Sequence, residues 1–570
     1  MKKIYILSTI ALAVAGLTSC DDLLDKDPLD TFANTDTYWN STDNVEYQCN
    51  HLYNEYVGYG NGTGYGWFYF KSLSDDQANP SFENWTFINV PASSTTYYDD
   101  QFEAIRQCNY VIENVRTCDL DDEDKLHYEG VARMNRAWLF YQLVRCYGDI
   151  QWVNTPIDPA DTETLYAARD DRDMVMDSVL ADLNFACGTI QGSDHNYWNA
   201  DLPYAMKADI CLYEGTYSKY RTTDGNGQAA DESRAKTYLN ECVSACEAVM
   251  SAGYSLNDSY QENYNSIDLE DNPEMIFYKH YVQDYFMHST VDYTMSSSEQ
   301  YGLTKDGFES YLFLDGQPLA STTLDTNDAA YIDDDGYLYL GDVLSVRDKR
   351  LQETIDPYVC VSGYPWQRAG GANMVSSTGY TIAKYDNYED MTVYYRNNTN
   401  KNYTDAPLFW LSVVYLDYAE AKAELGDLSE SDFESSIKGL YDRAGIEDMT
   451  VAKLEAIDDP ANNMDVSSLI WEIRRCRRSE LMFDNWVRYW DLIRWHQLDK
   501  LDTVEHPEIV TGANLAGDTE GAADVSLVSG TTYIDVSHSL TRVFDNKYYF
   551  YPIPSDQLAL NPNLTQNPGW

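Results

Sequence analysis

The sequence VARMNRAWLFYQLVRCY, residues 131–147, is the clearest helical signal in the chain. Its apolar residues recur at steps of three and four and form two stripes, one through Val131 and Trp138 and one through Ala137. A helix that is apolar on two faces is buried between neighbouring elements. Gly148 follows directly and favours a helix C-cap, because glycine readily adopts the left-handed backbone conformation.

Three further segments, 204–220, 235–254 and 411–427, place small residues beside large aromatic ones at the same helical spacing. We predict that 235–254 packs antiparallel to 204–220. Such helix pairs resemble tetratricopeptide repeats, although the spacing between units is too irregular for a simple array. The chain is therefore predicted to be built on helix pairs.

Two other stretches lack helical periodicity. Residues 254–404 are rich in Gly, Asp, Asn, Ser and Tyr and contain two short β-like runs, 337–340 and 391–395. Residues 56–100 form a second loop-rich stretch. Long ordered loops on a rigid scaffold commonly carry function, so we expect a binding site in these segments.

The N-terminus has the layout of an export signal. Lys2 and Lys3 precede an apolar run over 4–17, which is shorter than the roughly 20 residues that a membrane-spanning helix requires. An ordinary secretory signal with an incidental cysteine is one interpretation. However, Leu17-Thr18-Ser19-Cys20 resembles a bacterial lipobox, in which Cys20 would be lipidated. We predict a signal peptide over 1–19 and an acidic spacer over 20–40.

The composition narrows the range of partners. The 570 residues carry a formal net charge of -54, which disfavours binding to nucleic acid and to anionic lipid surfaces. Contact with a membrane is therefore expected only through the lipid anchor. The 49 Tyr, 13 Trp and 17 Phe offer rings that suit sugars, because an aromatic side chain joins an apolar face to a polar edge. For any single tyrosine, packing between helices is the simpler explanation.

Motifs spread along the chain resemble those of the SusD/RagB family. They are CDDLLDKDPLD at residue 20, YDDQFEAIRQCNYVIENV at 98, GVARMNRAWLFYQLVRCYGDI at 130, SVRDKRLQETI at 345, YAEAKAELGD at 418, RRSELMFDNWVRYWDLIRW at 477 and NPNLTQNPGW at 561. The resemblance implies about four tetratricopeptide-like helix pairs beside an irregular, loop-rich half with short strands. It also implies one domain over 41–570, with an insertion at about 254–404 and a C-terminal segment at about 465–570.

The resemblance implies a role as well as a fold. Proteins of this family sit on the outer face of the outer membrane, bind an oligosaccharide or polysaccharide, and act as a lid on a TonB-dependent, SusC-like transporter. The sequence departs from the family where Asp484 and Asn485 follow Phe483, because the family usually has an acid and a glycine there. On a continuous helix over 474–495, Arg477 would reach Glu480, and Arg488 would reach Asp484 and Asp491.

No catalytic or cofactor motif is present in the sequence. We find no G-x-S-x-G, no H-E-x-x-H and no phosphate-binding glycine pattern, and abundant carboxylates alone do not indicate a glycosidase. We therefore expect neither catalysis nor a cofactor. His280 and His288 are isolated and are expected to be structural or exposed. Asp333, Asp335 and Asp342 weakly resemble a calcium loop, although Tyr331 occupies the first ligand position.

Exposed loop aromatics with neighbouring polar groups are the best candidates for a glycan site. By region, the family site combines the early loop with the insertion. The candidate residues are Trp67, Asp76, Trp85, Tyr285, Tyr293, Tyr301, Tyr364, Trp366 and Arg368. For Trp85 and Trp366, the simpler alternative is a ring that anchors its own loop.

Two other functions stay open at this point. The chain can be a helical-repeat adaptor that binds only protein, in which case the loop aromatics serve a protein interface. A surface glycoside hydrolase is the other alternative, and it requires that the protein release reducing ends from a polysaccharide. The ligand itself is not identified by the sequence.

Overall fold

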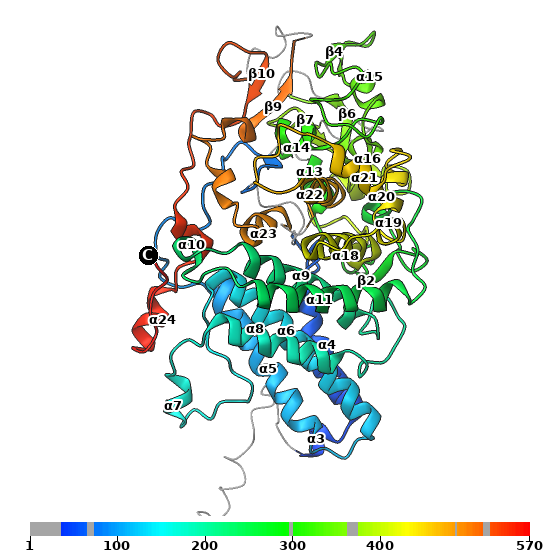
Figure 1. The fold of residues 1–570 in the computed structure, drawn as a ribbon. Helices are drawn as coiled ribbons and strands as arrows, with labels where there is room; N and C mark the ends of the chain where they lie inside the picture. The colour runs from blue at the N-terminus through cyan, green and yellow to red at the C-terminus, as the bar shows by residue number, and fades with distance from the viewer. Residues whose placement is uncertain are drawn as a thin grey trace, which may run out of the picture.

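The structure is a computed structural model that describes residues 36–64, 66, 73–295, 300–361, 374–484, 487–516 and 525–570. Figure 1 shows a helical half, containing α3 to α11, beside a loop-rich half that carries most of the short strands. The expectation of a mainly α-helical protein with a large irregular half is confirmed. The leader and Cys20 lie outside the described residues. In the described part, no helix combines the length and the hydropathy needed to cross a bilayer.

The helices of the first half pack as antiparallel neighbours. Gly215 lies against Leu239, and the amide of Asp231 donates to the carbonyl of Ser218 at 2.8 Å. The antiparallel pairing of 204–220 with 235–254 is therefore confirmed, although the second helix ends early, before Gly253 with its φ of +101°. The elements are α3 (Asp36–Trp39), α4 (Thr42–His51), η1 (Leu52–Glu55), η2 (Thr95–Asp99), α5 (Asp100–Val115), α6 (Asp122–Tyr147), α7 (Thr162–Leu165), α8 (Arg172–Ala186), α9 (Leu202–Tyr220), α10 (Thr223–Asn226) and α11 (Glu232–Met250).

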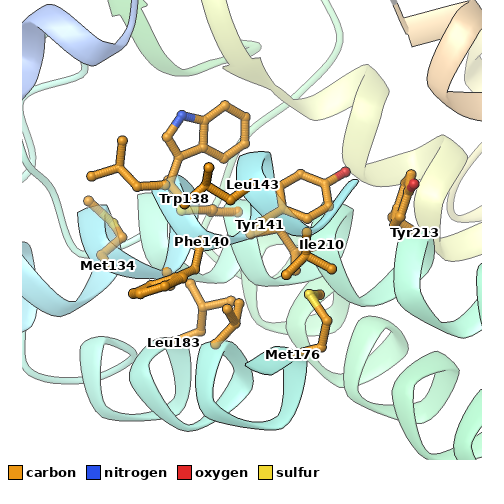
Figure 2. Packing of buried hydrophobic residues seen from close by; sticks show 14 of the residues in the cluster. Met134, Trp138, Phe140, Tyr141, Leu143, Met176, Leu183, Ile210 and Tyr213 are labelled. Carbon is orange, nitrogen blue, oxygen red and sulfur yellow. The ribbon is translucent and has the colours of Figure 1, made fainter. Parts of the chain in front are cut away.

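Helix α6 is the centre of this half, as its two apolar stripes predict. Its Trp138 and Phe140 are buried, and Figure 2 shows them with Met176 and Leu183 of α8. The helix ends at Gly148, whose φ of +70° is strained for any residue with a Cβ. The double-sided burial explains why no single polar face is visible in this sequence.

The loop-rich half contains a six-stranded antiparallel sheet in the order β1-β3-β7-β6-β5-β4. Its first strand comes from the early loop and pairs with β3, so the two loop-rich stretches of the sequence meet in one sheet. The elements are β1 (Gln77–Ala78), α12 (Glu262–Asn265), β2 (Met275–Lys279), α13 (Thr290–Met295), β3 (Gly302–Leu303), α14 (Lys305–Ser310), β4 (Tyr331–Ile332), β5 (Leu338–Tyr339), α15 (Gly341–Ser345), α16 (Lys349–Thr354), β6 (Ile355–Val359), β7 (Tyr380–Ile382), α17 (Val393–Arg396) and β8 (Ala406–Trp410).

The prediction of a strand within 337–340 is confirmed by β5. The prediction of a strand at 391–395 is wrong, because the helix α17 forms there instead.

A separate ribbon of β2 and β8 lies between two hydrophobic cores. Phe277 and Phe409 belong to the core of the helical half, whereas Tyr278 and Trp410 belong to the core of the loop-rich half. The ribbon thus connects the scaffold to the insertion.

The prediction of one continuous helix over 474–495 is wrong. Helix α22 ends at Glu480, and α23 begins at Val487 after a turn in which Phe483 has a φ of +70°. The elements of the C-terminal part are α18 (Leu411–Leu425), α19 (Glu430–Glu434), α20 (Lys438–Arg443), α21 (Val451–Ala456), α22 (Ser468–Glu480), α23 (Val487–Arg494), η4 (Leu498–Leu501), η5 (Pro507–Val510), β9 (Thr511–Asn514), β10 (Tyr533–Asp535), η6 (Asn546–Tyr549) and α24 (Ser555–Leu560).

The predicted ion pairs of this segment are also wrong, because both arginines reach distant partners. Arg477 pairs with Asp417 of α18 at 2.7 Å and with Asp491 of α23 at 3.0 Å. Arg488 binds both carboxylate oxygens of Asp75, at 2.8 and 2.6 Å. The break after Glu480 leaves Asp484 outside both helices, and Glu480 and Asp491 are bound instead by Arg350 and Arg477.

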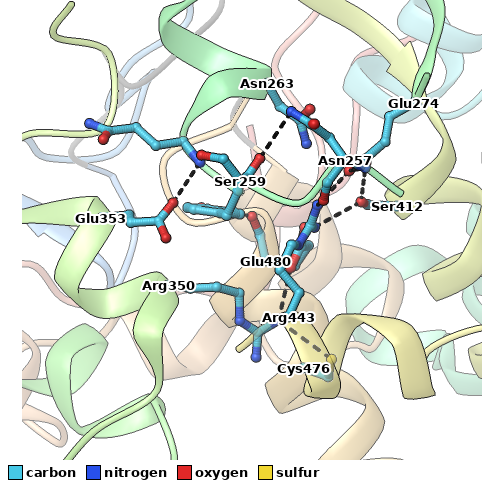
Figure 3. Close-up of polar contacts among 12 residues, drawn as sticks. Asn257, Ser259, Asn263, Glu274, Arg350, Glu353, Ser412, Arg443, Cys476 and Glu480 are labelled. Atoms are coloured by element: carbon cyan, nitrogen blue, oxygen red, sulfur yellow. Dashed lines mark hydrogen bonds and ion pairs between the residues drawn. The ribbon is translucent and has the colours of Figure 1, made fainter. Parts of the chain in front are cut away.

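Glu480 instead belongs to a buried polar network that joins four elements (Figure 3). It binds Arg350 of α16 at 2.9 Å and also binds Arg443 of α20, which in turn binds Glu274 just before β2. Arg350 is held on its other side by Asp348 at 2.7 Å. These carboxylates are each matched by a guanidinium group, as buried charges require.

Candidate functional site

Three loops meet on the surface of the loop-rich half and support a cluster of tyrosines. They are the early loop, a middle loop between β2 and α13, and a third loop that precedes β8. The early loop contributes Gly64, whose carbonyl accepts from the amide of Ser289 at 2.7 Å. Asn400 comes from the third loop, and its side chain accepts from the amide of Gly64 at 2.5 Å and from the hydroxyl of Ser289 at 3.0 Å. Asn400 therefore joins segments from all three loops.

The middle loop forms a tight turn with a tyrosine at its tip. Val282 and Phe286 pair as an antiparallel bridge, and Asp284 between them has a φ of +62°. Tyr285 beside it is 88% exposed, the most exposed large apolar or aromatic side chain among the described residues. An aromatic ring exposed to this degree can stack on a ligand.

The third loop, residues 393–404, begins with the short helix α17 and adds three more tyrosines. Tyr394 lies edge-on to Tyr395 at 5.1 Å, and Tyr395 lies edge-on to Tyr403 at 5.3 Å. The hydroxyl of Tyr395 donates to Asp284 at 3.0 Å, which connects this row to the turn that carries Tyr285. Tyr394 is 54% exposed. We call Tyr285, Tyr394, Tyr395 and Tyr403 the loop surface.

A buried aromatic layer holds the loop surface in place. Tyr281 stacks on Phe286 at 5.3 Å and lies 4.6 Å from the ring of His288. Burial lowers the pKa of His288 to about 3, so its imidazole is neutral. Its Nδ1 accepts from the amide of Thr290 at 3.1 Å, and its Nε2 therefore carries the proton and donates to the carbonyl of Thr404 at 2.9 Å. His288 thus fixes one loop against the other.

Of the candidate glycan residues in the insertion, Tyr285 belongs to the loop surface. Tyr293 is half-buried on α13, one turn beyond Ser289. Tyr301 is 5% exposed and packs in the core of the loop-rich half. Trp67, Tyr364, Trp366 and Arg368 lie outside the described residues.

The two early-loop candidates that the structure describes, Trp85 and Asp76, both have structural contacts. Trp85 is 5% exposed, stacks on Tyr548 at 4.4 Å and donates its indole N–H to the carbonyl of Val543 at 2.7 Å. This is the anchoring arrangement that the sequence left open as the alternative. Asp76 is 3% exposed and binds Arg478 at 2.7 Å. Neither side chain presents a surface to a ligand in this structure.

Sequence reasoning missed Tyr394, Tyr395 and Tyr403. They lie in the run YYRNNTNKNY, residues 394–403, whose density of tyrosine and asparagine was the available signal. We interpreted part of this run as a strand, and so its rings were not considered as a surface. The pairing of Tyr395 with Asp284 joins residues too distant in sequence for any local pattern to predict.

The calcium candidates do not come together. Asp333 accepts from the amides of Asp335 and Tyr337 at 3.0 and 2.9 Å, so its carboxylate caps the β4–β5 turn. Among the described residues, the group that best resembles metal ligands is Asp268, His280 and Asp405. There, Nδ1 of His280 is already hydrogen-bonded to Asp405 at 3.0 Å, which explains the contact without an ion.

Comparison with known proteins covers nearly the whole chain. A model described as the SusD family matches residues 188–570, and one described as starch-binding, associating with the outer membrane, matches residues 27–195. None of the curated proteins gives a significant match.

Solved structures share the fold at low identity. A SusD-like carbohydrate-binding protein from Bacteroides fragilis is 20% identical, with a TM-score of 0.71 over 93% of this chain and 100% of that chain. A second SusD-like protein from the same organism is 21% identical, with a TM-score of 0.67 over 96% of this chain and 100% of the other. A laminarin-binding SusD-like protein is 15% identical, with a TM-score of 0.53 over 93% and 100%.

Proposed function

Because the chain belongs to the SusD family, we propose that it is a non-catalytic glycan-binding lipoprotein of the outer membrane. The family match over residues 188–570 is the observation that carries this function. A surface with two exposed tyrosines, Tyr285 and Tyr394, held by three hydrogen-bonded loops, supports it independently, because flat rings and nearby hydrogen-bonding groups are what sugar recognition needs.

Anchoring and partnership complete the proposed role. Cys20 carries the lipid, and the chain faces the cell exterior as the lid of a SusC-like, TonB-dependent transporter. The acidic segment 20–40 serves as a spacer between the lipid and the folded part. Together with the sequence pattern at residues 17–20, the description of the second family model as associating with the outer membrane supports this placement.

The ligand is expected to be a glycan that stacks on Tyr285 and Tyr394. Tyr285→Ala with Tyr394→Ala is expected to weaken binding about tenfold, since each ring contributes roughly 0.5–1.5 kcal/mol. Calorimetry with the full chain solubilised in detergent, titrated with starch, laminarin and pectin, measures this change. Tyr47→Ala is the matched control, because Tyr47 is 66% exposed on α4, a helix that does not contribute to the loop surface.

The same mixtures are assayed for released reducing ends. Binding without release is expected. Release would contradict the non-catalytic role, whereas no binding to any glycan would favour the protein-only adaptor. Unchanged binding by the double variant would move the site away from the loop surface.

A further inference from the structure

Three tyrosines stand in register across the edge of the six-stranded sheet. Tyr331 of β4 is paired directly with Tyr339 of β5, and Tyr339 is paired directly with Tyr358 of β6. Directly paired residues project from the same face of a sheet. The ring centroids lie 5.8 and 5.0 Å apart. We call these three residues the tyrosine ladder.

The ladder lies at the edge of the sheet, where Tyr331 is exposed and Tyr339 and Tyr358 are half-buried. Strand β4 ends the sheet order, and its Tyr331 and Ile332 are 40% and 39% exposed. On the opposite face, Leu338 and Val359 are buried, and Ile332, which pairs with Leu338, is exposed at the edge of that face. Proteins usually protect an edge strand with charge or with a covering segment, so exposed apolar residues there indicate a contact surface.

A glycine makes room for the central ring. A Cβ at Gly341 would lie 2.1 Å from the ring of Tyr339, so only glycine allows the ring to lie where it does. The position of the ladder is thus built into the local sequence, and it does not depend on the loop surface.

The charge around the ladder selects the kind of ligand. Asp334, Asp335 and Asp342 are exposed, and no Lys or Arg occurs from residue 306 to residue 346. An anionic ligand would be repelled, whereas carboxylates accept hydrogen bonds from hydroxyl groups. Burial and the neighbouring Asp333 raise the pKa of Tyr358, so its phenol is neutral at physiological pH.

We propose that the tyrosine ladder is a second binding surface, which takes a neutral polysaccharide chain. This inference rests on the proposed glycan-binding function and adds a site built from other elements than the loop surface. The ring planes are inclined by 86° and 52° to their neighbours, so the ladder is not flat. It therefore fits a single soluble chain better than a crystalline surface.

Two binding surfaces on one protein strengthen the binding of a long chain, because the second contact becomes intramolecular. Tyr339→Ala is expected to weaken binding of a neutral polysaccharide, with starch and laminarin as probes, by threefold or more. Tyr339→Phe keeps the ring and is expected to bind like the wild type. Tyr166→Ala serves as the control, since Tyr166 is 44% exposed beside α7 in the helical half. Calorimetry on the detergent-solubilised full chain gives the affinities, and thermal unfolding verifies that each variant is folded.

The outcomes separate the two ideas. If the Tyr285→Ala, Tyr394→Ala double variant loses affinity while Tyr339→Ala binds like the wild type, the ladder site is overturned and the proposed function stands. Weaker binding by Tyr339→Ala with retained binding by Tyr339→Phe supports the ladder. A wild type that binds none of the polysaccharides overturns the proposed function and the ladder with it. Should Tyr339→Ala not fold, a threefold or greater loss of affinity by Tyr358→Ala supports the ladder and unchanged affinity overturns it.

Discussion

Asp484→Asn is expected to lower the free energy of unfolding by about 3–5 kcal/mol, because it leaves the ammonium of Lys384 buried without its counter-charge. Both side chains are 0% exposed, and Nζ lies 2.7 Å from Oδ1 of Asp484. The carboxylate also accepts from the hydroxyl of Tyr264 at 2.7 Å. The pair ties the turn after α22 to the segment after β7, so its loss removes one of the buried contacts between the insertion and the C-terminal helices.

Lys384→Met, which removes the other partner of the pair, is expected to lower the free energy of unfolding by an amount that depends on pH. Burial raises the pKa of Asp484 to about 6 even beside Lys384, and it lowers the pKa of Lys384 to about 8. In Lys384→Met, the pKa of Asp484 rises further, since the attracting cation is gone. A group with a raised folded pKa stabilises the fold when protonated and loses that contribution as the pH rises. The variant is therefore expected to be less destabilised at pH 5 than at pH 8.

Two control variants show whether the loss of stability comes from burial of an unpaired charge or simply from loss of an ion pair. Lys438→Met removes an exposed pair with Asp442, whose atoms are 2.6 Å apart, and is expected to change stability by less than about 0.5 kcal/mol. The double variant Lys384→Met, Asp484→Asn is expected to be more stable than either single variant, because no unpaired charge is left. Urea unfolding at both pH values measures these differences. Additive losses in the double variant would show that the two side chains do not act as a pair.

The same pair shows why the sequence predicted the helices but not this turn. Apolar spacing predicts α6, α9, α11 and α18, since a buried helix needs apolar residues at steps of three and four. The break after Glu480 has no such local signal. In the turn that follows, Asp484 binds Lys384, which is 100 residues away in sequence. Arg488 likewise finds Asp75 only in the folded chain.

The candidate site was predictable by region, and only in part by residue. Loop composition pointed to the early loop and the insertion, and Tyr285 of that set is exposed at the loop surface. Trp85 has the same local signal, an aromatic ring in a polar loop, but its ring is used in stacking on Tyr548. Exposure of a loop aromatic is decided by which distant segment covers it, and a single sequence does not contain that information.

Trp138→Ala is expected to destabilise the protein by about 3–5 kcal/mol, the range for truncating a buried aromatic side chain. Trp138 is 5% exposed, stacks on Tyr56 at 5.9 Å with an interplanar angle of 17°, and meets Phe409 of β8 edge-on at 6.1 Å. The cavity would open between α6, the start of the early loop and β8. Thermal unfolding of the variant, with exposed Leu126→Ala on the same helix as control, measures the loss.

The same substitution is also expected to loosen the loop surface without touching it. Phe409 belongs to β8, and the chain reaches Tyr403 only three residues before that strand begins. Faster amide hydrogen exchange in β8 and in residues 394–404, with unchanged exchange in β5, would show that the helical half holds this site in place. Equal acceleration in β5 would instead mean that the whole insertion opens together. Unchanged exchange in both would mean that the loops are held by His288 and Asn400 alone.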